Sequence, residues 1–194
     1  GIRDRQKTDD EGRKPVTGAV LEIIAKEDII TPDKEVRLKK GTVADTVTTD
    51  KNGKAESKDL FPGNYSVREK SAPEGYVLNT GTHDVELKYK DQDTAVVYGD
   101  VRITDEFVKG KIRITKTDSE TGKLIPVKAE FEITAAEDIV TSDGAVRVKK
   151  GTVVDTVATG KDGKGSSKEL FPGKYAVTEK TAPSGYLLNS QTFN

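Results

Sequence analysis

The chain has 194 residues, which is enough for one large domain or two small ones. Hydrophobic residues make up 33% and charged residues 34%, a balance that favours small cores with much solvated surface over one thick globule. The net charge of −1 gives no attraction to nucleic acid, and no apolar run reaches the roughly 20 residues that insert across a membrane. No signal peptide is apparent, so we expect a mature or excised segment.

The residue types that are missing exclude most enzyme chemistry. The chain has no Cys, no Met, no Trp and a single His. Disulfides, thiolate metal sites and cysteine nucleophiles are therefore excluded, and zinc would need more nitrogen or sulfur ligands than the chain supplies. His83 lies in the polar stretch NTGTHD and is interpreted as an exposed loop or strand-edge residue. We expect a protein that is not an enzyme, with no cofactor and no metal.

Taken in chain order, the predicted elements are short strands. β-Branched and aromatic residues recur with a period near two in YSVRE, VELKY, AVVYGDVRI, KIRITK, AEFEIT and GTVVDTV. Turn sequences such as DKNGK, FPG, APEG, GKDGK and APSG separate these segments. DKNGK is interpreted as a tight hairpin turn and not a calcium loop, because its counterpart GKDGK has too few carboxylates. A short helical turn is predicted at 135–139, and the whole pattern predicts an all-β sandwich or barrel.

The chain is an internal duplication. KDLFPGNYSVREKSAPEGYVLN begins at Lys58 and KELFPGKYAVTEKTAPSGYLLN begins at Lys168, an offset of 110 residues (168 minus 58). The second copy stops at Asn194, the counterpart of Asp84, so it lacks the equivalent of residues 85–105. We therefore expect two tandem Ig-like β-sandwich modules, 1–108 and 109–194, with a short linker at 106–110 that favours a stiff rod. The second module should lack its last strands and have an open sheet edge beside its first strand.

In several predicted strands, the apolar residues of one face are followed on that face by an ionisable residue. Side chains alternate along a strand, which places four such residues on the faces of the apolar residues before them: Glu69, Asp105, Lys116 and Glu179. They are either charges just outside the core or members of a buried Lys-Glu-Asp cluster. Burial disfavours charged forms, so a buried Lys tends to the nucleophilic amine and a buried carboxyl to the acid that an amine can attack. A neighbouring Glu can shuttle the proton, and the product is an amide.

The motifs resemble a known family. K-T-D-x-E-T-G-K, then A-E-F-E-I, then L-F-P-G-x-Y-x-V-x-E-K-x-A-P-x-G-Y is similar to the Cna protein B-type repeats, the prealbumin-like, SpaA-type domains of Gram-positive surface adhesins and pilins. The resemblance spans both copies and implies a prealbumin-like sandwich in each. It also implies a spontaneous isopeptide bond between Lys7 and Asp105, assisted by Glu69. In the second copy it implies Lys116 and Glu179 without an acceptor, so that Lys116 should pair with Glu179 or shift towards its neutral form.

One segment departs from this pattern. The first strand of copy one reads IRDRQK, so Arg3 and Arg5 share the predicted face of Lys7, where copy two has Ile112 and Ile114. Arginines are poor core residues. This strand is therefore predicted to be frayed, shifted in register or altered at the beginning of the chain.

The resemblance implies a structural role on a bacterial surface. We expect stalk or spacer repeats of an extracellular protein, anchored to the cell wall through a region outside this segment, whose partners are the neighbouring repeats. The alternatives are an adhesive module that binds a host protein or glycan, and a segment of a backbone pilin. The matching loops of the two copies and an aromatic content of 6% favour the spacer, and neither a sorting motif nor a pilin lysine motif is visible.

Overall fold

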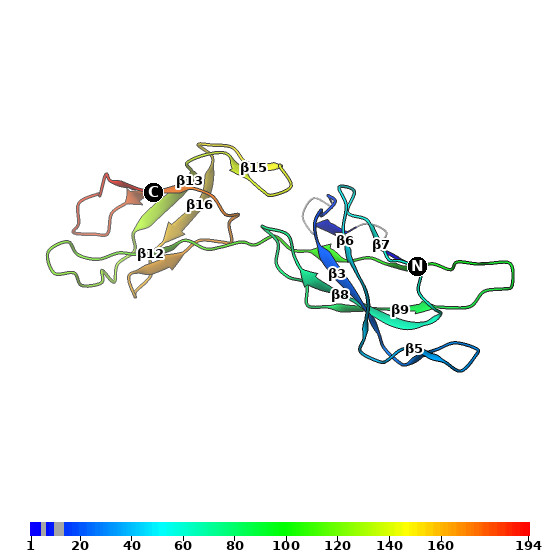
Figure 1. Ribbon diagram of the computed structural model, residues 1–194. Helices are drawn as coiled ribbons and strands as arrows, with labels where there is room; N and C mark the ends of the chain where they lie inside the picture. Colours follow the sequence, from blue (N-terminus) through cyan, green and yellow to red (C-terminus); the bar gives the residue numbers. More distant parts are fainter. Residues whose placement is uncertain (5–6, 10–13) are drawn as a thin grey trace. The chain divides into compact units, whose positions relative to one another are not determined.

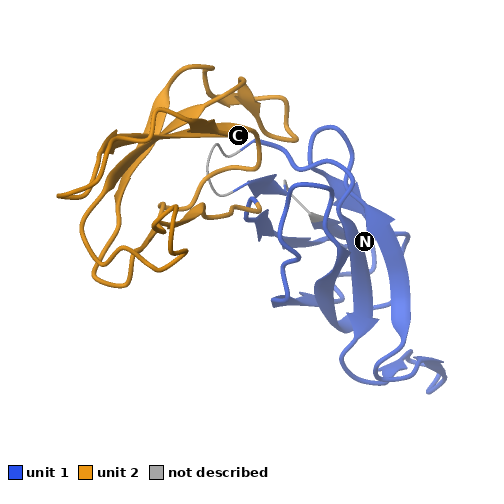
Figure 2. Cartoon of the chain, turned by 90° about the vertical axis from the view of Figure 1, so that its left-hand side faces the viewer, with its two compact units in different colours: residues 1–107 blue, residues 108–194 orange. Residues whose placement is uncertain are grey.

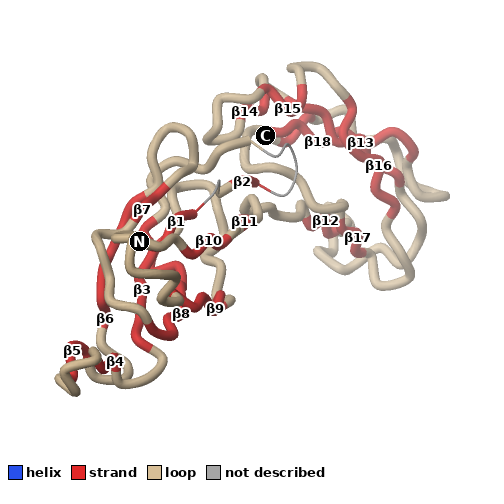
Figure 3. Tube along the Cα trace, turned by 90° about the vertical axis from the view of Figure 1, so that its right-hand side faces the viewer, coloured by secondary structure: helices blue, strands red, loops and turns tan. Residues whose placement is uncertain are grey.

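The computed structural model describes residues 1–4, 7–9 and 14–194. It divides into two compact units, Gly1–Phe107 and Val108–Asn194, which are coloured separately in Figure 2. Figure 3 shows strands and loops throughout the described residues, with no helix among them. In particular, these residues contain no helix with the length and hydropathy that crossing a membrane requires. The prediction of an all-β chain of two tandem modules is confirmed.

Unit 1 is built from short strands, several of which are labelled in Figure 1. In chain order these are β1 (Ile2–Asp4), β2 (Thr8–Asp9), β3 (Val20–Ala25), β4 (Ile29–Ile30), β5 (Val36–Leu38), β6 (Val43–Thr48), β7 (Ala55–Glu56), β8 (Gly63–Ser71), β9 (Thr82–Leu87), β10 (Gly99–Val101) and β11 (Thr104–Asp105).

Two layers of strands form the sandwich of unit 1. One is the antiparallel sheet β6-β3-β8-β9. The other contains β10-β1-β7, in which β1 runs parallel to β10, and the parallel pair β11-β2. The first and last strands of the unit therefore lie side by side, which brings together residues about a hundred positions apart in sequence.

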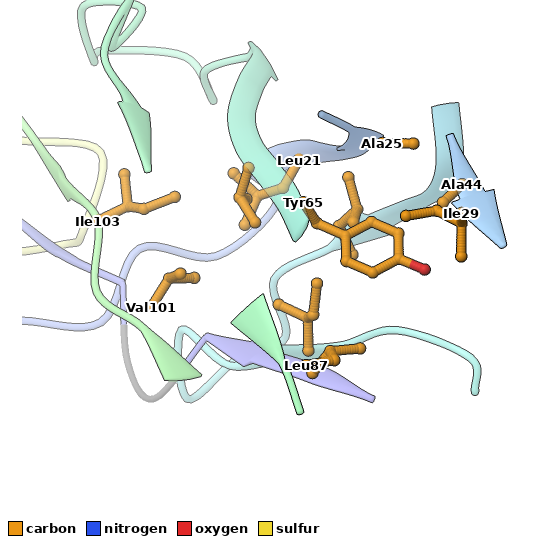
Figure 4. Packing of buried hydrophobic residues seen from close by; sticks show 11 residues of the cluster. Leu21, Ala25, Ile29, Ala44, Tyr65, Leu87, Val101 and Ile103 are labelled. Atoms are coloured by element: carbon orange, nitrogen blue, oxygen red, sulfur yellow. The ribbon is translucent and has the colours of Figure 1, made fainter. Parts of the chain in front are cut away.

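The core of unit 1 lies between these layers and follows from strand alternation. In β8, the alternate residues Tyr65, Val67 and Glu69 are buried, and Arg68 on the opposite face is exposed. Figure 4 shows Tyr65 among side chains that include Ile29 and Leu87, and Ile103, between β10 and β11, belongs to the same cluster. Burying each large apolar side chain stabilises the fold by roughly 1.5–3 kcal/mol. The Tyr65 hydroxyl donates a hydrogen bond to the carbonyl oxygen of Phe61 at 2.7 Å, so its polar atom is satisfied.

Unit 2 repeats most of this arrangement. Its strands are β12 (Arg113–Thr115), β13 (Glu130–Ala135), β14 (Ile139–Val140), β15 (Val146–Val148), β16 (Val153–Ala158), β17 (Lys164–Ser166), β18 (Tyr175–Thr181) and β19 (Thr192–Phe193). The sheet β16-β13-β18-β19 corresponds to β6-β3-β8-β9, and the pair β12-β17 corresponds to β1-β7.

The described strands of unit 2 include no counterpart of β10 or β11. As a result β12 pairs with β17 along one edge and has no strand partner along the other. A groove of about 1070 Å³ lies along this edge, and its apolar lining includes Ile112, Ile114, Phe131, Tyr175, Val177 and Phe193. The prediction that the second module lacks its last strands and has an open sheet edge is confirmed.

Two local predictions differ from the structure. The predicted helical turn at 135–139 is wrong: Ala135 ends β13, a bend follows, and Ile139 begins β14. The backbone N–H groups of Ala135 and Ala136 donate to the carbonyl oxygens of Thr152 and Lys174 on neighbouring segments, which removes the local hydrogen bonds that a helical turn needs.

DKNGK forms a tight turn but not a hairpin between paired strands. The Asp50 carboxylate accepts hydrogen bonds from the N–H groups of Asn52 and Lys54, and Gly53 has a positive φ of 68°. The flanking strands enter different sheets, because β6 pairs with β3 while β7 pairs with β1. The turn therefore connects the two layers of the sandwich.

Candidate functional site

Three strands of unit 1 bring the predicted Lys, Glu and Asp together. Lys7 directly precedes β2, Glu69 lies on β8, and Asp105 ends β11. β2 and β11 run parallel, with Thr8 opposite Thr104 and Asp9 opposite Asp105. This register sets the Asp105 side chain beside Lys7, while Glu69 reaches them from the opposite sheet.

The Lys7 side chain is enclosed between the two acids. Its Nζ atom lies 2.6 Å from Asp105 Oδ1 and 3.2 Å from Glu69 Oε1. All three side chains have an exposed fraction of 0%. Such a buried cluster is costly to form from charged groups unless protons are shared or the charges are removed.

Burial has its clearest effect on the pKa of Asp105. Loss of solvation raises the pKa of its carboxyl from 3.8 to about 6; the Lys7 contact opposes this rise and the nearby Glu69 adds to it. The Oδ2 atom of Asp105 is buried and has no hydrogen-bond partner among the residues that the structure describes. Burial thus shifts this carboxyl towards its protonated form, which is the form that an amine can attack.

The DKNGK turn holds the backbone of Lys7. The Lys7 N–H donates to the Gly53 carbonyl oxygen at 2.6 Å, and the Lys7 carbonyl accepts from the N–H of Val16 at 2.8 Å. A Cβ atom on Gly53 would lie 2.4 Å from the Lys7 carbonyl oxygen, so the turn requires glycine both for its positive φ and for this close approach. The same relationship recurs in unit 2, where the N–H of Lys116 donates to Gly163 at 2.8 Å.

Asn79 contacts both acid-bearing strands and was not identified from the sequence. Its backbone N–H donates to Glu69 Oε2 at 2.7 Å, and its side-chain Nδ2 donates to the Thr104 carbonyl oxygen at 2.7 Å. An Asn stands ten positions after the Glu in both copies, at 79 and at 189. That recurrence is the sequence signal that could have drawn attention to it.

Unit 2 contains part of the same site. Lys116 Nζ lies 2.9 Å from Glu179 Oε1, so the lysine is paired with the acid that the sequence assigns to it. The Lys116 side chain is 15% exposed, whereas that of Lys7 is fully buried. Ile112 and Ile114 pack against the core on the same side as Lys116, and Lys116 also lines the groove beside β12.

Arg3 lies outside the core, so the prediction that it shares the face of Lys7 is wrong. Its guanidinium carbon lies 3.5 Å from the centroid of the Tyr98 ring, and its Nε atom lies 3.9 Å from Asp100 Oδ1. Stacking on an aromatic ring beside a carboxylate suits a partly exposed arginine. Arg3 lies on β1 (Ile2–Asp4) and Lys7 directly precedes β2 (Thr8–Asp9), so the two residues do not belong to one described strand. Arg5 lies outside the described residues.

Neither His83 nor the acidic residues form a metal site in the described part of the chain. His83 lies on β9, the edge strand of its sheet, and is partly exposed, in agreement with the strand-edge interpretation. Among the residues in 1–4, 7–9 and 14–194, no group of three or more His, Cys, Asp or Glu side chains is arranged to hold a metal ion.

Curated proteins similar to the chain are much longer than the chain. The serine-aspartate repeat-containing protein D of Staphylococcus aureus (strain Newman) is 31% identical over 149 residues, which is 75% of this chain and 11% of that protein. The trypsin-resistant surface T6 protein of Streptococcus pyogenes serotype M6 is 34% identical over 80 residues, which is 41% of this chain and 12% of that protein.

Comparison with solved structures and with protein families agrees on the fold. The Bacillus anthracis TIE protein superposes with a TM-score of 0.66 at 29% identity, covering 99% of this chain and 30% of that chain. The family profile of the SpaA prealbumin-like fold domain matches residues 4–102 and 110–194. Since the two matches cover both units almost from end to end, the chain belongs to the family of SpaA prealbumin-like fold domains, as its motifs predict.

Proposed function

We propose that the chain is a pair of stalk repeats from an extracellular bacterial surface protein, and that unit 1 is locked by an isopeptide bond between Lys7 and Asp105. The observation that carries the proposal is the contact of one buried Lys7 Nζ atom with both Asp105 and Glu69. The similarity to a streptococcal surface protein supports the location. Cell-wall anchoring, through a region outside this segment, and neighbouring repeats as partners are parts of the same proposal.

The proposed reaction is a single condensation. The reacting forms are the neutral Lys7 amine and the protonated Asp105 acid, which proton transfer across the Nζ–Oδ1 contact produces from the ion pair. Nζ attacks Asp105 Cγ to form the C–N bond, and Glu69 takes a proton from the nitrogen and delivers it to the departing hydroxyl group. The C–O bond breaks, one water leaves, and the carboxylate of Glu69 is regenerated. No oxidant or cofactor is required, and two buried charged groups are replaced by one neutral amide.

The position of the link suits a load-bearing role. Lys7 directly precedes β2, near the beginning of unit 1, and Asp105 ends β11, its last strand; the two strands are paired in parallel. A pulling force applied through the two ends of the unit acts on these two strands, and a covalent bond between them prevents their separation. The chain has no Cys, so a disulfide cannot supply this reinforcement.

Intact-mass measurement tests the proposal. We expect the folded chain to weigh one water less than its sequence, and Glu69→Ala to restore the full mass. Tandem mass spectrometry should place the link between the peptides that carry Lys7 and Asp105. Glu179→Ala is the matched control, because it removes the equivalent acid of unit 2 and should leave the mass deficit unchanged. A full sequence mass for the folded wild-type chain contradicts the proposal.

A further inference from the structure

We propose that Asn79 is a positioning residue for the Lys7–Asp105 condensation, acting as a clamp between the strand that carries Glu69 and the strand that carries Asp105. This inference rests on the proposed function and extends it to a residue outside the reacting triad. Asn79 follows the APEGYVL loop, between β8 and β9. It touches neither Lys7 nor the Asp105 carboxyl in the described contacts, so its role is to fix the geometry of other groups.

The two ends of the clamp are separate hydrogen bonds from one residue. The backbone N–H of Asn79 donates to Glu69 Oε2, which leaves Oε1 of the same carboxylate facing Lys7 Nζ. The side-chain Nδ2 donates to the carbonyl oxygen of Thr104, the residue directly before Asp105. Each distance is 2.7 Å. Asn79 therefore ties the assisting acid to the backbone of the acceptor.

The orientation of the Asn79 amide is itself fixed. Its Oδ1 atom accepts a hydrogen bond from the N–H of Gly81 at 2.9 Å, which directs the Nδ2 group towards Thr104. A side chain held at its acceptor end loses little further freedom when its donor end binds. This arrangement is preorganised, which is the property that lowers the barrier of a reaction between two bound groups.

The same loop also contacts the two residues that follow Asp105 in the chain. The Val77 N–H donates to the Glu106 carbonyl oxygen at 2.8 Å. The rings of Tyr76 and Phe107 stack with centroids 4.6 Å apart. The loop thus holds the chain just before Asp105 through Asn79 and just after it through Val77 and Tyr76. Asp105 itself is left with its side chain directed at Lys7.

Unit 2 shows that the loop adopts this geometry without an acceptor strand. The Asn189 N–H donates to Glu179 Oε2 at 2.7 Å, and Asn189 Oδ1 accepts from the N–H of Gln191 at 2.9 Å. These bonds match those of Asn79 with Glu69 and Gly81. Asn189 also lines the groove beside β12. These two bonds therefore form in the loop without the last strand, and only the bond from Nδ2 needs the acceptor strand.

The test measures the rate of water loss during refolding. Chains recovered unfolded in urea are refolded by dilution, and the unlinked fraction is followed by intact mass. Asn79→Ala removes the donor without adding charge, and Asn79→Asp removes the donor but keeps an acceptor for Gly81. We expect both variants to form the bond about tenfold more slowly than wild type. Asn189→Ala is the matched control and should react at the wild-type rate.

Hydrogen exchange supplies a readout that does not depend on the bond. In a Lys7→Met background, where no amide can form, Asn79→Ala should increase exchange at residues 104–107 while leaving that of β3 unchanged. If wild type loses water and Asn79→Asp reacts as fast as wild type, the clamp is wrong and the proposed function stands. If wild type never loses water, the proposed function fails, and unchanged exchange at 104–107 then overturns the clamp as well.

Discussion

Asp105 Oδ1 lies 2.6 Å from Lys7 Nζ, although the two residues are 98 positions apart (105 minus 7). Their strands are parallel neighbours, and the contact is shut off from water by the two sheets. A bond between these two side chains would close a loop that includes nearly all of unit 1. The length of that loop governs how strongly the bond stabilises the unit.

Preventing the bond should lower the stability of unit 1 alone. By analogy with a disulfide that closes a loop of this length, we expect Glu69→Gln to reduce the free energy of unfolding by about 4–5 kcal/mol. The substitution preserves the shape of the side chain and an oxygen that can accept from Asn79. Urea unfolding followed separately for the two units measures the effect. Glu179→Gln should leave unit 1 unchanged, and equal losses in the two variants would contradict the prediction.

Stability of the unlinked unit should depend on pH through Asp105. Its carboxyl has a pKa of about 6 in the folded state against 3.8 ordinarily, so between these values the folded state binds more protons than the unfolded state. The free energy of unfolding therefore falls as pH rises through this window, by less than the roughly 3 kcal/mol of the full shift, because Glu69→Gln removes the contribution of Glu69. The measurement compares Glu69→Gln with Glu69→Gln/Asp105→Asn from pH 4 to pH 7. A constant difference between the two variants across this range would show that Asp105 is not responsible.

Gly53→Ala should disturb the site through the backbone of Lys7. The new Cβ would lie 2.4 Å from the Lys7 carbonyl oxygen at a residue whose φ is +68°. Gly41→Ala is the matched control, since Gly41 has a φ of +83° and no atom within 4 Å of the added Cβ. Both variants incur the backbone cost of roughly 1 kcal/mol, and the clash adds to it only at Gly53. We expect Gly53→Ala to unfold at lower urea and to form the bond more slowly. Identical behaviour of the two variants would rule out this role of the turn.

The open edge of unit 2 should accept a strand from another molecule. β12 has a free edge among the described strands, and the groove beside it is lined by Lys116, which already contacts Glu179. The peptide DVRITDEF, residues 100–107, carries the strand that fills the equivalent place in unit 1. We expect it to add in parallel to β12 and to become covalently linked to Lys116.

Mass spectrometry of the mixture checks this capture. The adduct should weigh the sum of chain and peptide less one water, and it should disappear with Glu179→Ala. A peptide in which the residue equivalent to Asp105 is Ala tests whether the carboxyl is the acceptor. Finding Lys116 already bonded to a side chain of the purified protein would contradict the prediction.

The sequence by itself determined the class of the fold and the faces of several strands. Alternation in YSVRE and VRITD places Glu69 and Asp105 on buried faces, because a strand turns successive side chains to opposite sides. The 110-residue duplication predicted two modules and an unfilled edge in the second. These features follow from local spacing and from comparison of the chain with itself, so no knowledge of sheet pairing is needed.

Only the tertiary structure decided which residues meet and how. The parallel register of β2 with β11 sets Asp105 beside Lys7, and the pairing of β1 with β7 and β10 places Arg3 where it stacks on Tyr98. Asn79 is polar and partly exposed, so its pattern is that of an ordinary loop residue until Thr104 is seen to accept its amide. Contacts between residues far apart in sequence depend on strand order and register, which local periodicity does not encode.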